Sequence, residues 1–100
     1  MLVLAVAYRA KPGCRGEALR AARACSAESR RETGNMDYTF YAGIDDESAF
    51  FLFEQWESRE ALDAHLKTRH VAEFRAALRD LLEAPASVRV YEVSSTRNGL

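Results

Sequence analysis

The chain has 100 residues, of which 48% are hydrophobic, and this is enough for one domain with a modest core. Its 14 Lys and Arg against 15 Asp and Glu leave a net charge of −1 at pH 7, without any long block of like charge. Nucleic acid and anionic membranes are therefore not expected as partners. We expect a single domain over residues 1–93, followed by a polar tail over residues 94–100.

Two features near the N-terminus bear on the cellular compartment. The apolar residues 1–8 lack the basic region and the cleavage site of a signal peptide, so they predict a buried strand instead. Cys14 and Cys25 do not have the C-x-x-C spacing of a metal or redox site. We interpret them as reduced thiols and expect a cytoplasmic protein.

The first half of the chain predicts a strand, a helix and a second strand. A continuous apolar run at residues 2–8 indicates the first strand. The Ala- and Arg-rich residues 17–31 indicate a helix that Gly34 stops. Residues 36–42 alternate as a strand does, with four side chains on one face: Met36, Tyr38, Phe40 and Ala42.

A third strand is expected at residues 49–57, and it carries large apolar groups on both faces. One face holds Phe50, Leu52, Glu54 and Trp56, and the other holds Phe51, Phe53 and Gln55. Such a strand suits a sheet that is covered on both sides. Because the helices of this chain can cover only one side, we expect a second copy of the chain to cover the other.

Ser58 is expected to cap a short helix whose inward stripe is Leu62, His65 and Leu66. After a break near residues 68–70, a longer helix is expected. Its apolar face carries Val71, Phe74, Leu78, Leu81 and Leu82. Pro85 is expected to end it.

Residues 87–93 complete the order β-α-β-β-α-β. This order predicts an α+β protein with the ferredoxin-like split βαβ arrangement, in which helices lie on one face of a four-stranded antiparallel sheet. The fold alone does not specify a function.

Three segments carry a resemblance to a known family: EQWESREALDAHLKTRH (54–70), KPG (11–13) and RRETGNMDY (30–38). Together they resemble the antibiotic biosynthesis monooxygenase family, and the first is closest to the branch of bacterial quinol monooxygenases. The resemblance implies a homodimer in the form of a dimeric α+β barrel, with a pocket in each subunit between sheet and helices. It also implies oxygenation of a quinol or phenol without flavin, metal or haem.

The chain departs from other branches of that family. Leu52 and Leu62 stand where polyketide-tailoring members have an Asn and a Tyr, which speaks against a large polyketide substrate. Val6, His65 and Arg75 stand at the haem-contacting positions of the haem-degrading members, so the axial His is missing. Two His five residues apart, with no third ligand near them in sequence, also make a poor metal site. We therefore expect no cofactor and no metal.

The implied reaction needs a base, because triplet oxygen accepts an electron from a phenolate more readily than from a phenol. His65 is the leading candidate, since its ring titrates near neutral pH and points at the sheet. The alternative is that His65 only braces the broken helix. Glu54 is the second catalytic candidate, as a partner of His65 or as a proton acceptor. The alternative for Glu54 is an ion pair with Arg9 or Arg89.

The expected substrate-binding residues are Trp56, Tyr8, Tyr38, Tyr41, Leu52 and Leu62. Trp56 can instead be a core residue, and the tyrosines can serve packing alone. His70 is interpreted as a surface cap at a helix start.

Three functions remain open from the sequence. The first is a cofactor-independent monooxygenase acting on a quinol or a small phenol. The second is a non-catalytic dimer that binds small molecules or serves a stress response. The third is an isomerase or lyase on a small oxygenated metabolite, because one base in a dry pocket can also enolise a carbonyl compound.

Overall fold

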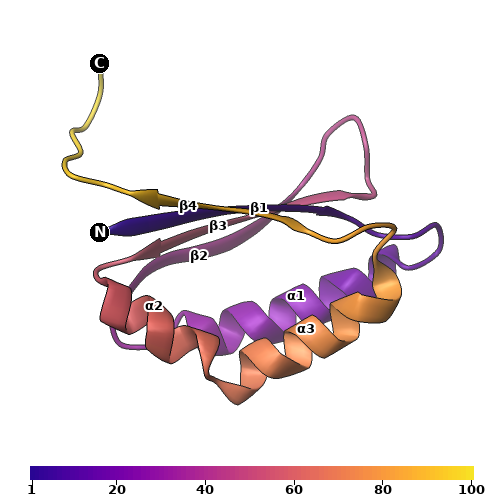
Figure 1. Cartoon of the computed structure of the whole chain (residues 1–100). Helices are drawn as coiled ribbons and strands as arrows, with labels where there is room; N and C mark the ends of the chain where they lie inside the picture. Colours follow the sequence, from indigo (N-terminus) through magenta and orange to yellow (C-terminus); the bar gives the residue numbers. More distant parts are fainter.

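The computed structural model describes all residues from 1 to 100 as four strands and three helices (Figure 1). In chain order these are β1 (Leu2–Arg9), α1 (Arg15–Ser29), β2 (Asn35–Ala42), β3 (Ala49–Trp56), α2 (Arg59–Leu66), α3 (Arg69–Leu81) and β4 (Ser87–Glu92). The strands form one antiparallel sheet in the order β2-β3-β1-β4. The expected ferredoxin-like α+β fold is confirmed. No helix is long and apolar enough to cross a membrane.

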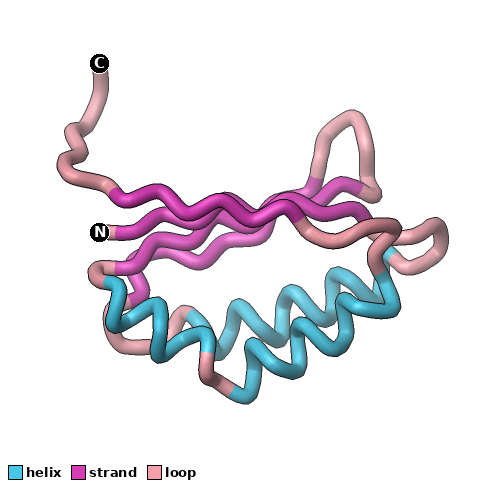
Figure 2. Tube along the Cα trace, viewed as in Figure 1, coloured by secondary structure: helices cyan, strands magenta, loops and turns pink.

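The three helices all lie on one side of the sheet, and no helix covers the other side (Figures 1 and 2). The side chains of β3 alternate as expected: Phe50, Leu52, Glu54 and Trp56 are buried beneath the helices. The alternate residues Leu2, Leu4, Val6 and Tyr8 of β1 complete this inner face. One face of the sheet thus forms the core with α1, α2 and α3.

The opposite, outer face of the sheet carries apolar side chains that no part of the chain covers. Tyr41, Phe51 and Ala7 are register partners in one row across the sheet. Tyr41 and Phe51 remain 53% and 39% exposed, and Tyr91 on β4 remains 47% exposed. A surface of this kind is typical of an interface between protein chains.

Two caps explain why the second helical region is broken. The Ser58 side chain accepts a hydrogen bond from the Ala61 amide at the start of α2, as expected. The Thr68 side chain accepts from the Val71 amide and starts α3 only two residues after α2 ends at Leu66. Each cap satisfies an amide that the first turn of a helix leaves unpaired.

Three details differ from the sequence expectation. Met36 is 55% exposed, because a bulge between Asn35 and Asp37 makes it an extra residue and removes it from the face of Tyr38. Leu66, expected to face inward, is 40% exposed at the last residue of α2. The helix α3 ends at Leu81, several residues before Pro85.

Candidate functional site

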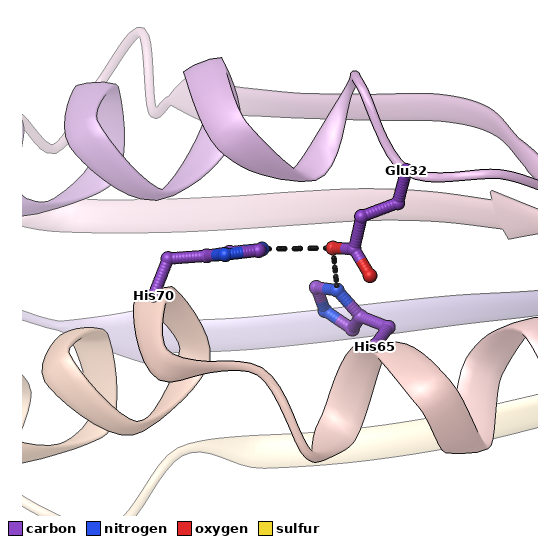
Figure 3. Close-up of side chains that lie close together, drawn as sticks. All are labelled: Glu32, His65 and His70. Carbon is purple, nitrogen blue, oxygen red and sulfur yellow. Dashed lines mark hydrogen bonds and ion pairs between the residues drawn. The ribbon is translucent and has the colours of Figure 1, made fainter.

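Glu32, His65 and His70 converge where the turn after α1 faces the junction between α2 and α3 (Figure 3). One carboxylate oxygen, Oε2 of Glu32, lies 2.6 Å from Nδ1 of His65 and 2.8 Å from Nε2 of His70. The three residues come from three places: the turn after α1, the end of α2 and the start of α3. The break between α2 and α3 lets two His five residues apart face the same carboxylate.

The turn that carries Glu32 is fixed by backbone contacts. The Glu32 amide donates to the carbonyl of Ser29, and the carbonyl of Gly34 accepts from the Glu57 amide. Gly34 has a φ of +85°, and a Cβ at this position would lie 2.6 Å from the Cβ of Ala61. Only glycine therefore lets this turn lie so close to α2.

The other ring nitrogen of His65 faces β3. Nε2 lies 3.7 Å from Oε1 of Glu54, and the same oxygen accepts a 3.0 Å hydrogen bond from Nε1 of Trp56. The Trp56 ring also packs against the His65 ring, with the ring centres 4.5 Å apart. The expected alternative, an ion pair of Glu54 with Arg9 or Arg89, is wrong because both arginines lie on strand positions of the outer face. Arg9 pairs with Asp46 and Glu83 instead.

Burial changes the proton affinity of both groups. Burial lowers the pKa of His65 below its ordinary value, and the hydrogen bond to Glu32 opposes this only in part. The imidazole is therefore neutral at neutral pH, and a proton on Nδ1 donated to Glu32 leaves a lone pair on Nε2. Burial also raises the pKa of Glu54 to about 7, against the opposing hydrogen bond from Trp56. Glu54 can therefore hold or release a proton at neutral pH.

A cavity of about 160 Å³ lies beside these groups, between the sheet and the helices. Most of its lining is apolar, and its polar members are Tyr38, Glu54, His65 and Arg75. Leu66 and Val88, both partly exposed, also line it. A mostly apolar cavity with a few convergent polar groups is the usual form of a small-molecule site.

The expected site residues divide into three groups. His65, Glu54, Tyr38 and Leu52 all line the cavity. Trp56 and Leu62 are fully buried in the layer behind it. Tyr8 and Tyr41 do not line it: Tyr8 stacks on Phe50, and Tyr41 lies on the outer face beside Phe51.

Tyr38, the tyrosine that lines the cavity, forms a hydrogen bond with the thiol of Cys25. The Tyr38 hydroxyl lies 3.3 Å from Sγ of Cys25, and burial raises the pKa of this hydroxyl, so that it stays protonated. Cys14 and Cys25 are both free thiols, as expected from the sequence.

Sequence reasoning missed Glu32 and misread His70. His70 is not a surface cap, because its side chain is only 18% exposed and its Nε2 contacts Glu32. The expectation that the two His lack a third ligand is likewise wrong, since Glu32 brings a third potential ligand atom within 4.8 Å of both. The only available signal was a carboxylate directly before a glycine turn, which is a common pattern.

The sequence and the fold are similar to those of known proteins. The family model for antibiotic biosynthesis monooxygenases matches residues 1–77. The chain is 34% identical over 94 residues to "Putative monooxygenase YcnE" of Bacillus subtilis. The alignment covers 94% of this chain and 99% of that protein. It is also 32% identical over 96 residues to "Uncharacterized protein sll1783" of Synechocystis. That alignment covers 96% of this chain but only 65% of the relative, which is the longer protein.

Solved structures show the same fold. A structure named "Putative antibiotic biosynthesis monooxygenase from Nitrosomonas europaea" superposes with a TM-score of 0.90 at 27% identity, covering 95% of this chain and all of that one. The structure of Rv0793 from Mycobacterium tuberculosis superposes with a TM-score of 0.89 at 27% identity, covering 95% and 96% of the two chains. The match of the family model and the similarity to the Bacillus protein agree with the fold, and the chain therefore belongs to the antibiotic biosynthesis monooxygenase family.

Proposed function

We propose that the protein is a monooxygenase that oxidises a quinol or another small phenol with molecular oxygen and without a bound cofactor. The observation that carries this proposal is the placement of His65. Its Nδ1 is held by Glu32, while its Nε2 faces Glu54, and both His65 and Glu54 line the cavity. A base held by a carboxylate beside a mostly apolar cavity is what removal of a phenolic proton requires. The monooxygenase names of relatives support oxygen chemistry.

The reaction can be written with these groups. Nε2 of His65 takes the phenolic proton, and Glu32 stabilises the imidazolium that forms. The phenolate gives one electron to oxygen, and the radical pair joins in a new C–O bond. The resulting hydroperoxide loses water, so that hydroquinone and O₂ give hydroxyquinone and H₂O. The substrate supplies all four electrons, and Glu54 can exchange a proton in the loss of water because its pKa is about 7.

The size of the cavity supports a substrate with one ring. A cavity of about 150 Å³ accommodates a benzene-sized molecule, and the cavity here measures about 160 Å³. Leu52 is one of the apolar residues that line it.

We also propose that the active form is a homodimer. The outer face of the sheet, which carries Phe51 and Tyr41, has no cover within the chain. A second copy placed face to face would bury it and form the dimeric barrel that the sequence resemblance implies.

Oxygen consumption tests the proposed function. Purified protein, supplied with a one-ring hydroquinone in an oxygen electrode, is expected to consume one O₂ for each hydroxyquinone formed, at a rate well above autoxidation. Quinone binding without oxygen uptake would support a non-catalytic binding protein. Exchange of substrate protons without oxygen uptake would support an isomerase or lyase. Either result would refute the proposal for this class of substrate.

A further inference from the structure

We propose that Glu32, His65 and His70 form a binding site for one divalent transition-metal cation, such as Zn²⁺. The candidate ligand atoms are Oε2 of Glu32, Nδ1 of His65 and Nε2 of His70 (Figure 3), and all lie within 4.8 Å of one another. Two imidazoles and one carboxylate form a common ligand set for Zn²⁺ and for its first-row neighbours.

The Glu32 oxygen has to move away from the two ring nitrogens to admit a cation. Ligand atoms around a tetrahedral zinc ion lie about 3.3 Å apart, given bonds of about 2.0 Å. The Glu32 oxygen now lies 2.6 Å and 2.8 Å from the two ring nitrogens. A rotation of the Glu32 side chain that lengthens both contacts toward this value would make room for the ion.

The surroundings of His65 match those of a metal ligand. A ligating histidine usually donates its other N–H to a carboxylate, and Nε2 of His65 faces Glu54. Trp56 fixes the Glu54 oxygen by its own hydrogen bond. His65 also lies in the last turn of α2, where the helix dipole favours positive charge. Glu32 therefore faces the position of the cation directly, Glu54 lies on the far side of the His65 ring, and Arg75 opposes a positive charge there.

A cation can reach the cluster from solvent. The side chains of Glu32 and His70 are 16% and 18% exposed, whereas that of His65 is 2% exposed. Glu32 and His70 would therefore bind the ion first, and the buried His65 would be the innermost ligand. Three protein ligands leave a further coordination position for water.

Metal binding and the base function of His65 exclude each other. A cation needs the lone pair of Nδ1, so the single proton of the neutral ring must then sit on Nε2. A protonated Nε2 cannot accept the phenolic proton. The cation would thus inhibit the enzyme by reversing the tautomer of His65. This inhibition rests on the proposed function, whereas the binding itself does not.

Zinc titration followed by calorimetry tests the site. The full-length protein, freed of metal by a chelator and dialysed, is titrated with ZnCl₂. We expect one Zn²⁺ per chain, and at least a tenfold weaker affinity for Glu32→Gln and for His70→Gln. Glu60→Gln, a substitution in the first turn of α2, serves as the matched control and should bind as the wild type does. Circular dichroism verifies that each variant is folded.

Two results would overturn the site: no stoichiometric binding by the wild type, or binding that both Glu32→Gln and His70→Gln leave unchanged. Activity is measured separately on the metal-free protein. Zinc binding in a protein that never turns over a hydroquinone would refute the proposed function and keep the site. Turnover that bound Zn²⁺ does not slow would refute the exclusion between metal and base.

Discussion

The two faces of the sheet differ in how their apolar side chains are covered. Over β1 and β3 the inner face, with Leu52 and Trp56, is covered by helices of the same chain, and it buries the polar Glu54 with a hydrogen-bond partner. The outer face, with Phe51 and Tyr41, is apolar but open. The proposed chemistry therefore lies on the face that the chain largely covers by itself. The other face is the one through which the proposed dimer would associate.

The largest effect on stability is expected from a substitution that removes a large side chain from the inner face. Trp56→Ala removes a fully buried ring that packs on His65 and bonds Glu54, so it should lower the free energy of unfolding by about 3–5 kcal/mol. Phe51→Ala, on the outer face, is the matched control. Urea denaturation of both variants, at a protein concentration where the chains are monomeric, should give a much smaller loss for Phe51→Ala. Equal losses would break the distinction between the faces.

A smaller effect on stability is expected from a change of pH. The pKa of Glu54 is raised from its ordinary 4.5 to about 7, so between these values the folded state holds a proton that the unfolded state has lost. The contribution of Glu54 to stability therefore falls as the pH rises from 4.5 to 7, by about 3 kcal/mol at most. Glu54→Gln cannot titrate, so its stability relative to the wild type should increase over that range. A constant difference between the two proteins would show that Glu54 titrates normally.

The weakest of these effects concerns the outer face. Phe51→Asp places a charge in the proposed dimer interface and should cost about 2 kcal/mol or more of association, roughly 30-fold in Kd. Ile44→Asp introduces the same charge at a fully exposed loop position and is the control. Sedimentation velocity should show dissociation for Phe51→Asp only. A wild-type monomer at micromolar concentration would contradict the proposed dimer.

Most of the fold could be predicted from the sequence because its signals are local. The alternation along β3 identified its buried face, and Ser58 marked the start of α2. The bulge at Met36 was not predictable, since the extra residue leaves the alternation of residue types unchanged. The end of α3 was placed too late because only Pro85 signalled it.

The candidate site was predicted only in part, for a similar reason. His65 and Glu54 lie in regular elements, whose periodicity indicates the direction of each side chain. Glu32 lies in an irregular turn and meets His65 across 33 residues of sequence. Such a contact depends on how the turn after α1 lies against α2, and no local pattern records it. His70 was misread for the same reason, because its partner is also Glu32.

The most direct test of the central claim, that His65 is the base, is the rate of oxygen uptake by His65→Gln with a hydroquinone substrate. Gln keeps a hydrogen-bond donor for Glu32 but cannot take a proton. If His65 is the base, turnover should fall by about 100-fold or more in protein that is still folded, as its melting curve would verify. A variant that is less stable but turns over substrate at the wild-type rate would show that His65 is not the base. His65 would then only brace the junction between α2 and α3.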